Sequence, residues 1–242
     1  TEIKPSCKTS RIIIYLYCMQ QVPLYVNLLF EFTALVTVWF FYRAAASSKK
    51  LLILLFAWML LQAILGMAGF YTVTNTLPPP FLLMVLPPVV CIILLFITKN
   101  GRRFIDRLNY KTLTILHVVR IPVEVVLFLL FTYKAVPQLM TFEGRNFDII
   151  AGITAPIVFY FAFVKNTMRA KWLLWWNFIC LVLLANIVIN AVLSAPFPFQ
   201  QFAFDQPNIA VLYFPFNWLP SVVVPLVLLS HLAVIKRLLK SN

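Results

Sequence analysis

Long apolar runs, nearly free of charge, constrain the fold of this chain more than any other feature of its sequence. An α-helix needs about 20 mainly apolar residues to cross a hydrocarbon core ~30 Å thick. Hydrophobic residues make up 62% of the chain and charged residues only 11%. A soluble domain has about 25% charged residues on average, so this chain lacks the polar surface of one. We therefore predict an all-α integral membrane protein.

Seven such runs predict a seven-transmembrane-helix bundle that forms a single polytopic membrane domain over residues 1–242. The expected spans are residues 23–42, 51–73, 81–98, 112–135, 149–164, 172–193 and 218–235. Pro87 and Pro88 lie inside the third run and predict a kink there. A basic loop is expected at residues 99–111. The aromatic segment 194–217 is expected to cap the outer end of the bundle, or to form a lid over an outward-facing cavity.

The positions of the basic residues predict the orientation of the bundle. Most of the 20 Lys and Arg residues fall in alternate loops on one side. The other side has only Lys4, Lys8, Arg11, Lys134 and Arg145. Short loops rich in Lys and Arg stay in the cytoplasm, so we expect the N-terminus outside and the C-terminus in the cytoplasm. We expect the protein in a bacterial cytoplasmic (inner) membrane. The net charge of +13 is explained by these loops, and we expect no nucleic-acid partner.

The fourth apolar run contains three ionisable side chains, His117, Arg120 and Glu124. At 100° per residue, the positions i, i+3 and i+7 fall within an arc of about 60° on one helix face. Each charge would cost about 2.5–3.5 kcal/mol at the centre of a lipid-facing helix, so the stripe should face the bundle interior. Arg120 and Glu124 are one turn apart and are expected to pair. Pro122 frees the carbonyl of Val118 beside them.

Other predicted spans place polar side chains at similar depth. If each span is centred in the bilayer, Glu31 and Gln62 lie within about 3 Å of the midplane, Asn186 about 5 Å outward and His231 about 6 Å inward. Intramembrane charge favours a functional site for Arg120, Glu124 and Glu31, with a static salt bridge as the alternative. For the amides, hydrogen bonding between helices is the simpler interpretation. For either histidine alone, a structural role is the simpler interpretation.

The residues exclude some chemistries and leave others open. A retinal Schiff base needs a lysine in mid-membrane, whereas Lys134 and Lys236 lie at span ends. A haem ligated by His117 and His231 stays open as an alternative to our expectation of no cofactor. A catalytic zinc needs three protein ligands, and Glu124 lies about 10 Å along the helix axis from His117, so we expect no metal site.

Acidic and sulfur-containing residues add little to these chemistries. We exclude intramembrane proteolysis by paired aspartates, because Asp106, Asp148 and Asp205 are all predicted to lie in loops. Cys7 and Cys18 lie on the expected outer side, where a disulfide bridge can form. Neither observation points to a catalytic residue.

The leading hypothesis is a non-catalytic membrane protein that binds or transports a small solute at a polar site near the bilayer midplane. Arg120 would engage an anionic group with Glu124 as its resting partner. Glu31, His117 and His231 would be candidate proton carriers. One alternative is a membrane-embedded enzyme or redox protein acting on a lipid-soluble substrate. Another is a receptor-like or assembly subunit without a cavity.

Overall fold

A computed structural model describes residues 18–240, except residues 75 and 77. Within those residues the regular structure is helical throughout, with no strand. The α-helices are α2 (Leu24–Ala44), α3 (Lys49–Met67), α4 (Leu82–Ile97), α5 (Lys99–Arg107), α6 (Tyr110–Leu116), α7 (Arg120–Thr132), α8 (Ile149–Phe159), α9 (Ala170–Leu193) and α10 (Val224–Lys240). The short helices are η1 (Phe70–Thr72), η2 (His117–Val119), η3 (Gln138–Met140), η4 (Tyr160–Val164), η5 (Ala210–Leu212) and η6 (Leu219–Val223), of which η4 and η6 are π-helices. The question of a bridge between Cys7 and Cys18 involves a residue outside the described part of the chain.

Among the described residues, five helical segments are long and apolar enough to cross a membrane. They are α2, α3, α6 to α7, α9, and η6 to α10, and the bent pair of α4 and α5 raises the number to six. The helix formed by α8 and η4 is also apolar but shorter. Its 11 and 5 residues rise about 24 Å, less than the ~30 Å hydrocarbon core. These findings support a helical membrane protein.

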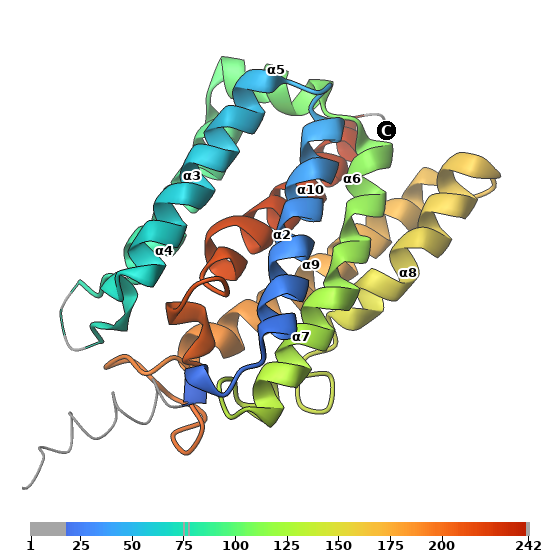
Figure 1. Cartoon of the computed structure of the whole chain (residues 1–242). Coiled ribbons are helices and arrows are strands. Elements are labelled where there is room, and N and C mark those ends of the chain that lie inside the picture. Colours follow the sequence, from blue (N-terminus) through green and yellow to red (C-terminus); the bar gives the residue numbers. More distant parts are fainter. Residues whose placement is uncertain (1–17, 75, 77, 241–242) are drawn as a thin grey trace, which may run out of the picture.

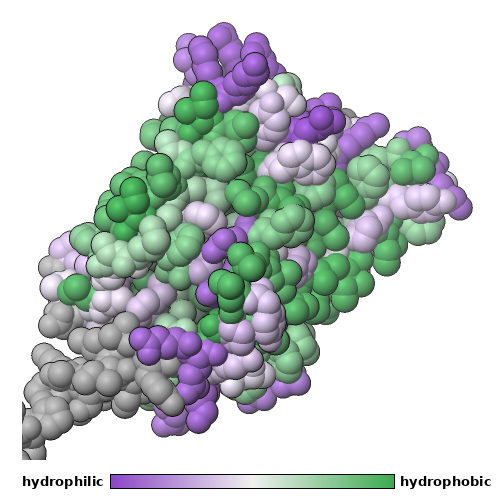
Figure 2. Space-filling model, viewed as in Figure 1, coloured by the Kyte–Doolittle hydropathy of each residue, from purple (hydrophilic) through white to green (hydrophobic). Residues whose placement is uncertain are grey.

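Figure 1 shows the helices side by side, with α3 and α4 paired as a hairpin at one edge of the bundle. Helix α5 and the C-terminal end of α10 lie at the same end of the bundle, which we call the basic end. Residues 133–148 and 194–217 lie at the other end, which we call the loop end. In Figure 2 hydrophobic side chains cover much of the flanks, and strongly hydrophilic ones gather mainly toward the ends. This distribution matches the surface that a bilayer requires.

Helix α5 corrects the expected basic loop at residues 99–111. It begins after Thr98, whose hydroxyl accepts a hydrogen bond from Gly101 N at 3.1 Å. The axis turns by 93° between α4 and α5. Gly101 packs directly against the backbone of Leu95, so only a residue without Cβ fits at this corner. Helix α4 runs unbroken through the two prolines where the kink was expected, and the sharp bend comes at its end.

The fourth apolar run changes helix type in its middle. Helix α6 passes into a 3-10 turn, His117–Val119, before α7 begins at Arg120. The backbone N–H of Arg120 donates to the His117 carbonyl, three residues back. Pro122 lies just beyond and cannot donate, which explains why the α-helical hydrogen-bond ladder tightens there. The break therefore lies beside the residues of the polar stripe.

The aromatic segment 194–217 closes the loop end of the bundle. Ile209 N and Ala210 N both donate to the carbonyl of Ala135, which follows α7. Phe197 packs with Tyr71 and Phe81 in a second apolar core that is separate from the main one. The segment is thus held on the bundle by backbone hydrogen bonds and buried rings.

Candidate functional site

The polar stripe of α6 to α7 is buried. His117 is 0% exposed, Arg120 3% and Glu124 1%. A small residue of α8 allows this burial, because Gly152 packs closely against Arg120 and Ile121.

Arg120 forms its ion pair with Asp148, not with Glu124. Its Nη1 donates to Asp148 Oδ1 at 2.8 Å, and its Nη2 lies 3.1 Å from His231 Nε2. The expected pairing of Arg120 with Glu124 one turn away is therefore wrong. Asp148 immediately precedes α8 and is buried, so a residue that the sequence placed in a loop supplies the counter-charge.

His231 of α10 links Arg120 to α9. Because a guanidinium can only donate, His231 Nε2 must accept. The ring then carries its proton on Nδ1, which lies 2.9 Å from Asn177 Oδ1 and donates to it. The amide nitrogen of Asn177 in turn donates to the Leu173 carbonyl at 2.9 Å. The hydrogen bonds thus assign a neutral imidazole to His231.

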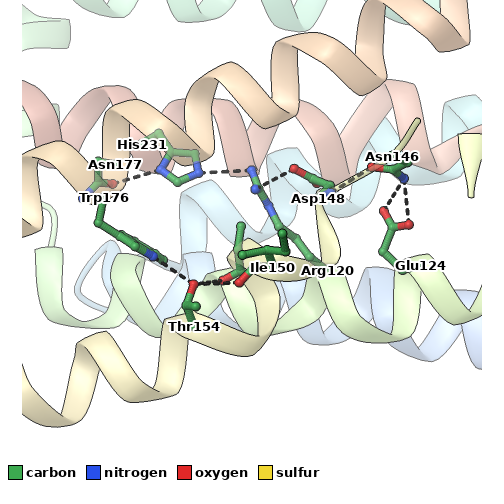
Figure 3. Close-up of polar contacts among 10 residues, drawn as sticks. Arg120, Glu124, Asn146, Asp148, Ile150, Thr154, Trp176, Asn177 and His231 are labelled. Atoms are coloured by element: carbon green, nitrogen blue, oxygen red, sulfur yellow. Dashed lines mark hydrogen bonds and ion pairs between the residues drawn. The ribbon is translucent and has the colours of Figure 1, made fainter. Parts of the chain in front are cut away.

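Glu124 is held by an amide. Asn146 Nδ2 donates to both carboxyl oxygens of Glu124, at 2.6 and 2.7 Å, and to the carbonyl of Met140 at 3.0 Å. The side-chain oxygen of Asn146 accepts from the backbone N–H of Asp148 at 3.0 Å. Figure 3 shows the result, a continuous polar chain that runs from Asn177 through His231, Arg120, Asp148 and Asn146 to Glu124.

His117 lies against this chain without a hydrogen bond to it. Its ring stacks on His231 with centroids 3.8 Å apart and an interplanar angle of 11°, and Trp176 meets it edge-on. Within the described residues neither of its nitrogens has a hydrogen-bond partner. Two axial histidines of a haem lie on opposite sides of the iron, whereas these rings are in face-to-face contact. The arrangement therefore does not fit a haem held between them.

The other predicted site residues lie elsewhere. Gln62 is buried and accepts from the Tyr71 hydroxyl at 2.6 Å, and its carbonyl accepts from Asn217 at 2.6 Å. Asn186 is partly exposed, and its amide donates to the Arg145 carbonyl at 2.7 Å. Glu31 is partly exposed on α2. In the part of the chain that the structure describes, no hydrogen bond joins Glu31, Gln62 or Asn186 to the polar chain.

A cavity of about 100 Å³ adjoins the Glu124 end of the polar chain. Both Glu124 and Asp148 line it, and Asn208 adds an amide from segment 194–217. The remaining lining residues are Phe81, Val85, Val123, Leu127, Met140, Leu184, Ile187, Val188, Ala191, Val192, Val211, Leu219, Pro220 and Val224. The cavity is therefore an apolar chamber with two carboxyl groups in its wall.

The two carboxyl groups differ in their electrostatic surroundings. Asp148 neutralises Arg120, whereas Glu124 has no cation within ion-pair distance in the described residues. A buried carboxylate without a counter-charge is costly in a membrane, so Glu124 either holds a proton or faces a cation. Arg120 does not line the cavity, because Asp148 and His231 occupy its guanidinium. The chamber thus presents a carboxyl group to any occupant.

The sequence reasoning missed Asn146 and Asp148. Both belong to the polar turn before α8, which looked like an ordinary loop. The sequence does contain one indication. An intramembrane arginine needs a counter-ion, and Asp148 stands directly before the next apolar helix. Asn177 of α9 forms an interhelical hydrogen bond with His231 of α10.

A family model described as Domain of unknown function (DUF8737) matches residues 77–239, about two thirds of the chain, which therefore belongs to this family. The matched range contains every residue of the polar chain, whereas Glu31 and Gln62 lie outside it. No curated protein and no solved structure matches the chain.

Proposed function

For this member of the DUF8737 family, we propose a seven-span membrane protein that binds and transports a small solute through the Glu124 cavity. The solute has an apolar body and a positively charged group such as a protonated amine. The observation that carries the proposal is the apolar chamber whose wall holds a carboxyl group without a cationic partner.

The seven-span topology adds α4 and the α8–η4 helix to the five long segments. Helix α4 has 16 residues and rises about 24 Å, so both short helices cross if the bilayer thins locally or polar flanks reach the interface. Helix α5 then lies along the membrane surface after its 93° turn. The basic residues of α5 and of the end of α10 favour the cytoplasmic side for the basic end. The described chain then begins on the outer side.

A cationic solute fits the cavity better than the anion suggested by the sequence. Arg120 already has Asp148 as its counter-ion, whereas the Glu124 carboxyl meets only the Asn146 amide. An anion in the chamber would face two carboxyl groups. Repulsion between like charges is strong in a low dielectric. A cation would compensate Glu124 while its apolar part contacts Leu127 and Ile187.

The cavity volume limits the solute to a few heavy atoms. An engineered cavity of about 150 Å³ holds benzene. The Glu124 cavity, at about 100 Å³, is smaller. Asn208 and Val211 of segment 194–217 close the chamber toward the loop end. Transport would require segment 194–217 to move away from the chamber. In this proposal the segment therefore acts as a lid, as expected from its length and composition.

The test compares three probes of similar size, namely n-butylammonium, n-butanol and butyrate, on the purified full chain in neutral detergent. A ligand that binds only the folded state raises the melting temperature. We expect n-butylammonium to raise it most and butyrate least. Glu124→Gln should abolish the response to n-butylammonium, while Glu143→Gln, an exposed loop carboxyl, should preserve it. Equal responses to the three probes, or an unchanged response of Glu124→Gln, would overturn the proposal.

Transport itself is measured with radiolabelled butylammonium in proteoliposomes. Uptake should depend on Glu124 and not on Glu143. The topology is tested separately with a membrane-impermeant thiol reagent on Glu143→Cys and Lys165→Cys, which should be labelled from opposite sides. Labelling of both from the same side would contradict the seven-span orientation.

A further inference from the structure

A second, larger cavity lies between the α3–α4 hairpin and the rest of the bundle. Its volume is about 420 Å³, and apart from Ser221 its lining residues are apolar. Leu54 and Trp58 line it from α3, Pro88 and Cys91 from α4, Leu226 from α10, and Phe104 from α5. Figure 1 shows the hairpin standing apart from α2 and α10 over this stretch. We call this cavity the hairpin groove.

The hairpin is tethered on both sides of the groove. Toward the loop end, the indole N–H groups of Trp58 and Trp218 donate to the carbonyls of Ser221 and Met59, each at 2.9 Å. At the basic end, Lys236 of α10 pairs with Asp106 of α5 at 2.9 Å. Because both ends are fixed, the space between them is held open by the fold.

The dimensions of the groove match one lipid chain in one leaflet. Along α3 it extends from Leu51 to Trp58, and along α4 from Leu95 to Pro87, which corresponds to about 10–12 Å of helix rise. One leaflet contributes about half of the ~30 Å hydrocarbon core. The groove volume of about 420 Å³ leaves room for an aliphatic chain. A cavity of roughly 150 Å³ already holds benzene.

The mouth of the groove is basic on one flank. Phe104 faces the groove from α5. At 100° per residue, Arg107 lies about 60° and Arg103 about 100° from Phe104 around the helix, and Asp106 lies beyond them on the same side, at about 160°. Both arginines are exposed, and neither forms an ion pair within the described residues. Asp106 is already paired with Lys236 and Lys240.

We infer that the hairpin groove binds one acyl chain of an anionic phospholipid, whose phosphate is held by Arg103 and Arg107 of α5. The apolar walls accept the chain, and the two guanidinium groups accept the headgroup. This binding site is separate from the Glu124 cavity, because the residues that line the two cavities are different. The lipid would fill the space between the hairpin and α10 and brace α3 and α4 against the bundle.

Native mass spectrometry of the delipidated full chain in neutral detergent tests the inference. The protein is titrated with dioleoyl phosphatidylglycerol and, separately, with dioleoyl phosphatidylcholine. We expect one phosphatidylglycerol to bind more tightly than any phosphatidylcholine. Near a membrane surface each basic residue contributes about a fivefold preference for anionic lipid. The variant Arg103→Gln/Arg107→Gln should therefore lose about 25-fold in affinity for phosphatidylglycerol, with little change for phosphatidylcholine.

Variants that fill the groove test the acyl-chain site. Cys91→Trp and Leu54→Trp place an indole in the groove and should each weaken binding of the first phosphatidylglycerol at least tenfold. Leu94→Trp is the matched control, because Leu94 is exposed on α4 but does not line the groove. Lys165→Gln/Lys171→Gln removes one basic residue just after η4 and one from the first turn of α9, and controls for overall charge.

Three outcomes would overturn the inference. They are equal affinity for the two lipids, unchanged binding in a folded Leu54→Trp or Cys91→Trp variant, and an equal loss in Lys165→Gln/Lys171→Gln and Arg103→Gln/Arg107→Gln. Circular dichroism and size-exclusion chromatography confirm folding for each variant. If one of the two groove-filling variants does not fold, the other decides the question.

Discussion

Arg120 reaches past the glutamate on its own helix and pairs with Asp148 at 2.8 Å, 28 positions along the chain. The pair joins α7 to the residue just before α8, and His231 extends the link to α10. Glu124 is thereby left with an amide as its partner. One ion pair thus determines which of the two carboxyl groups lining the cavity has a cationic partner and which has none.

Asp148→Asn should strongly destabilise the protein. The variant leaves Arg120 buried without its counter-charge, and breaking a buried pair in this way costs about 3–5 kcal/mol. Unfolding by sodium dodecyl sulfate in mixed micelles, followed by circular dichroism, measures the change. Asp205→Asn, an exposed loop substitution, should change stability by less than about 0.5 kcal/mol.

The double variant Arg120→Met/Asp148→Leu should be more stable than Asp148→Asn. Replacing both partners removes the unpaired charge, and such apolar replacements are often neutral or stabilising. If Asp148→Asn were as stable as the native protein, the ion pair would not be the element that holds the site together.

The two stacked histidines should respond differently to substitution. His231→Phe removes the acceptor of Arg120 and the donor to Asn177, and should cost about 2 kcal/mol. His117→Phe removes two nitrogens that have no hydrogen-bond partner in the described residues, so it should be neutral or stabilising. The same mixed-micelle unfolding experiment measures both. A greater loss in His117→Phe would indicate an unrecognised partner for that ring.

The helical membrane class follows from the sequence, because apolar runs of this length form few structures other than membrane-spanning helices. Burial of His117, Arg120 and Glu124 follows from their spacing, since residues on one helix face share one environment. The number of spans is harder to obtain from hydropathy. The segment Ile149–Val164 is apolar but short, and Leu82–Ile97 ends in a 93° bend. The seven-span count and the orientation stay predictions.

The partners within the site could not be derived, because they depend on how the helices pack. One turn of helix separates Arg120 from Glu124, and proximity in sequence favoured that pair. Tertiary packing instead buries Asp148, which a linear reading assigns to a loop. Centring each span likewise suggested one polar layer. Depth along the membrane normal does not specify the face of a helix, which explains why Gln62 bonds to Tyr71 instead.

Gly152→Ala should loosen the contact between α8 and α7. A Cβ at this position would lie 2.9 Å from a side-chain carbon of Ile121 and 3.0 Å from its backbone nitrogen, so α8 must shift. Such overpacking costs about 1–3 kcal/mol. Because Arg120 Cβ is only 3.2 Å away, the shift also disturbs the ion pair with Asp148. Mixed-micelle unfolding should show the loss.

The control for Gly152→Ala is Ile153→Ala on the same helix. Ile153 is half exposed on the flank of α8, where lipid replaces protein contacts, so the change should be under about 0.5 kcal/mol. Equal effects of the two substitutions would mean that close approach at Gly152 is unimportant for stability.

The ion pair between Asp106 of α5 and Lys236 of α10 should make the stability of the protein depend on pH. The hydrogen bond from Lys236 lowers the pKa of Asp106 below its ordinary value of 3.8. A carboxyl group with a lowered folded-state pKa stabilises the fold above that ordinary value, and the contribution is lost as the pH falls through the lowered pKa. The native protein should therefore exceed Asp106→Asn in stability by at most about 1 kcal/mol at neutral pH, because the pair is largely exposed. Unfolding measured between about pH 6 and pH 2 should show this difference shrinking only below about pH 4, and about 1 M salt should reduce it at every pH. A difference that stays constant across that range would assign the effect of Asp106→Asn to packing and not to the ion pair.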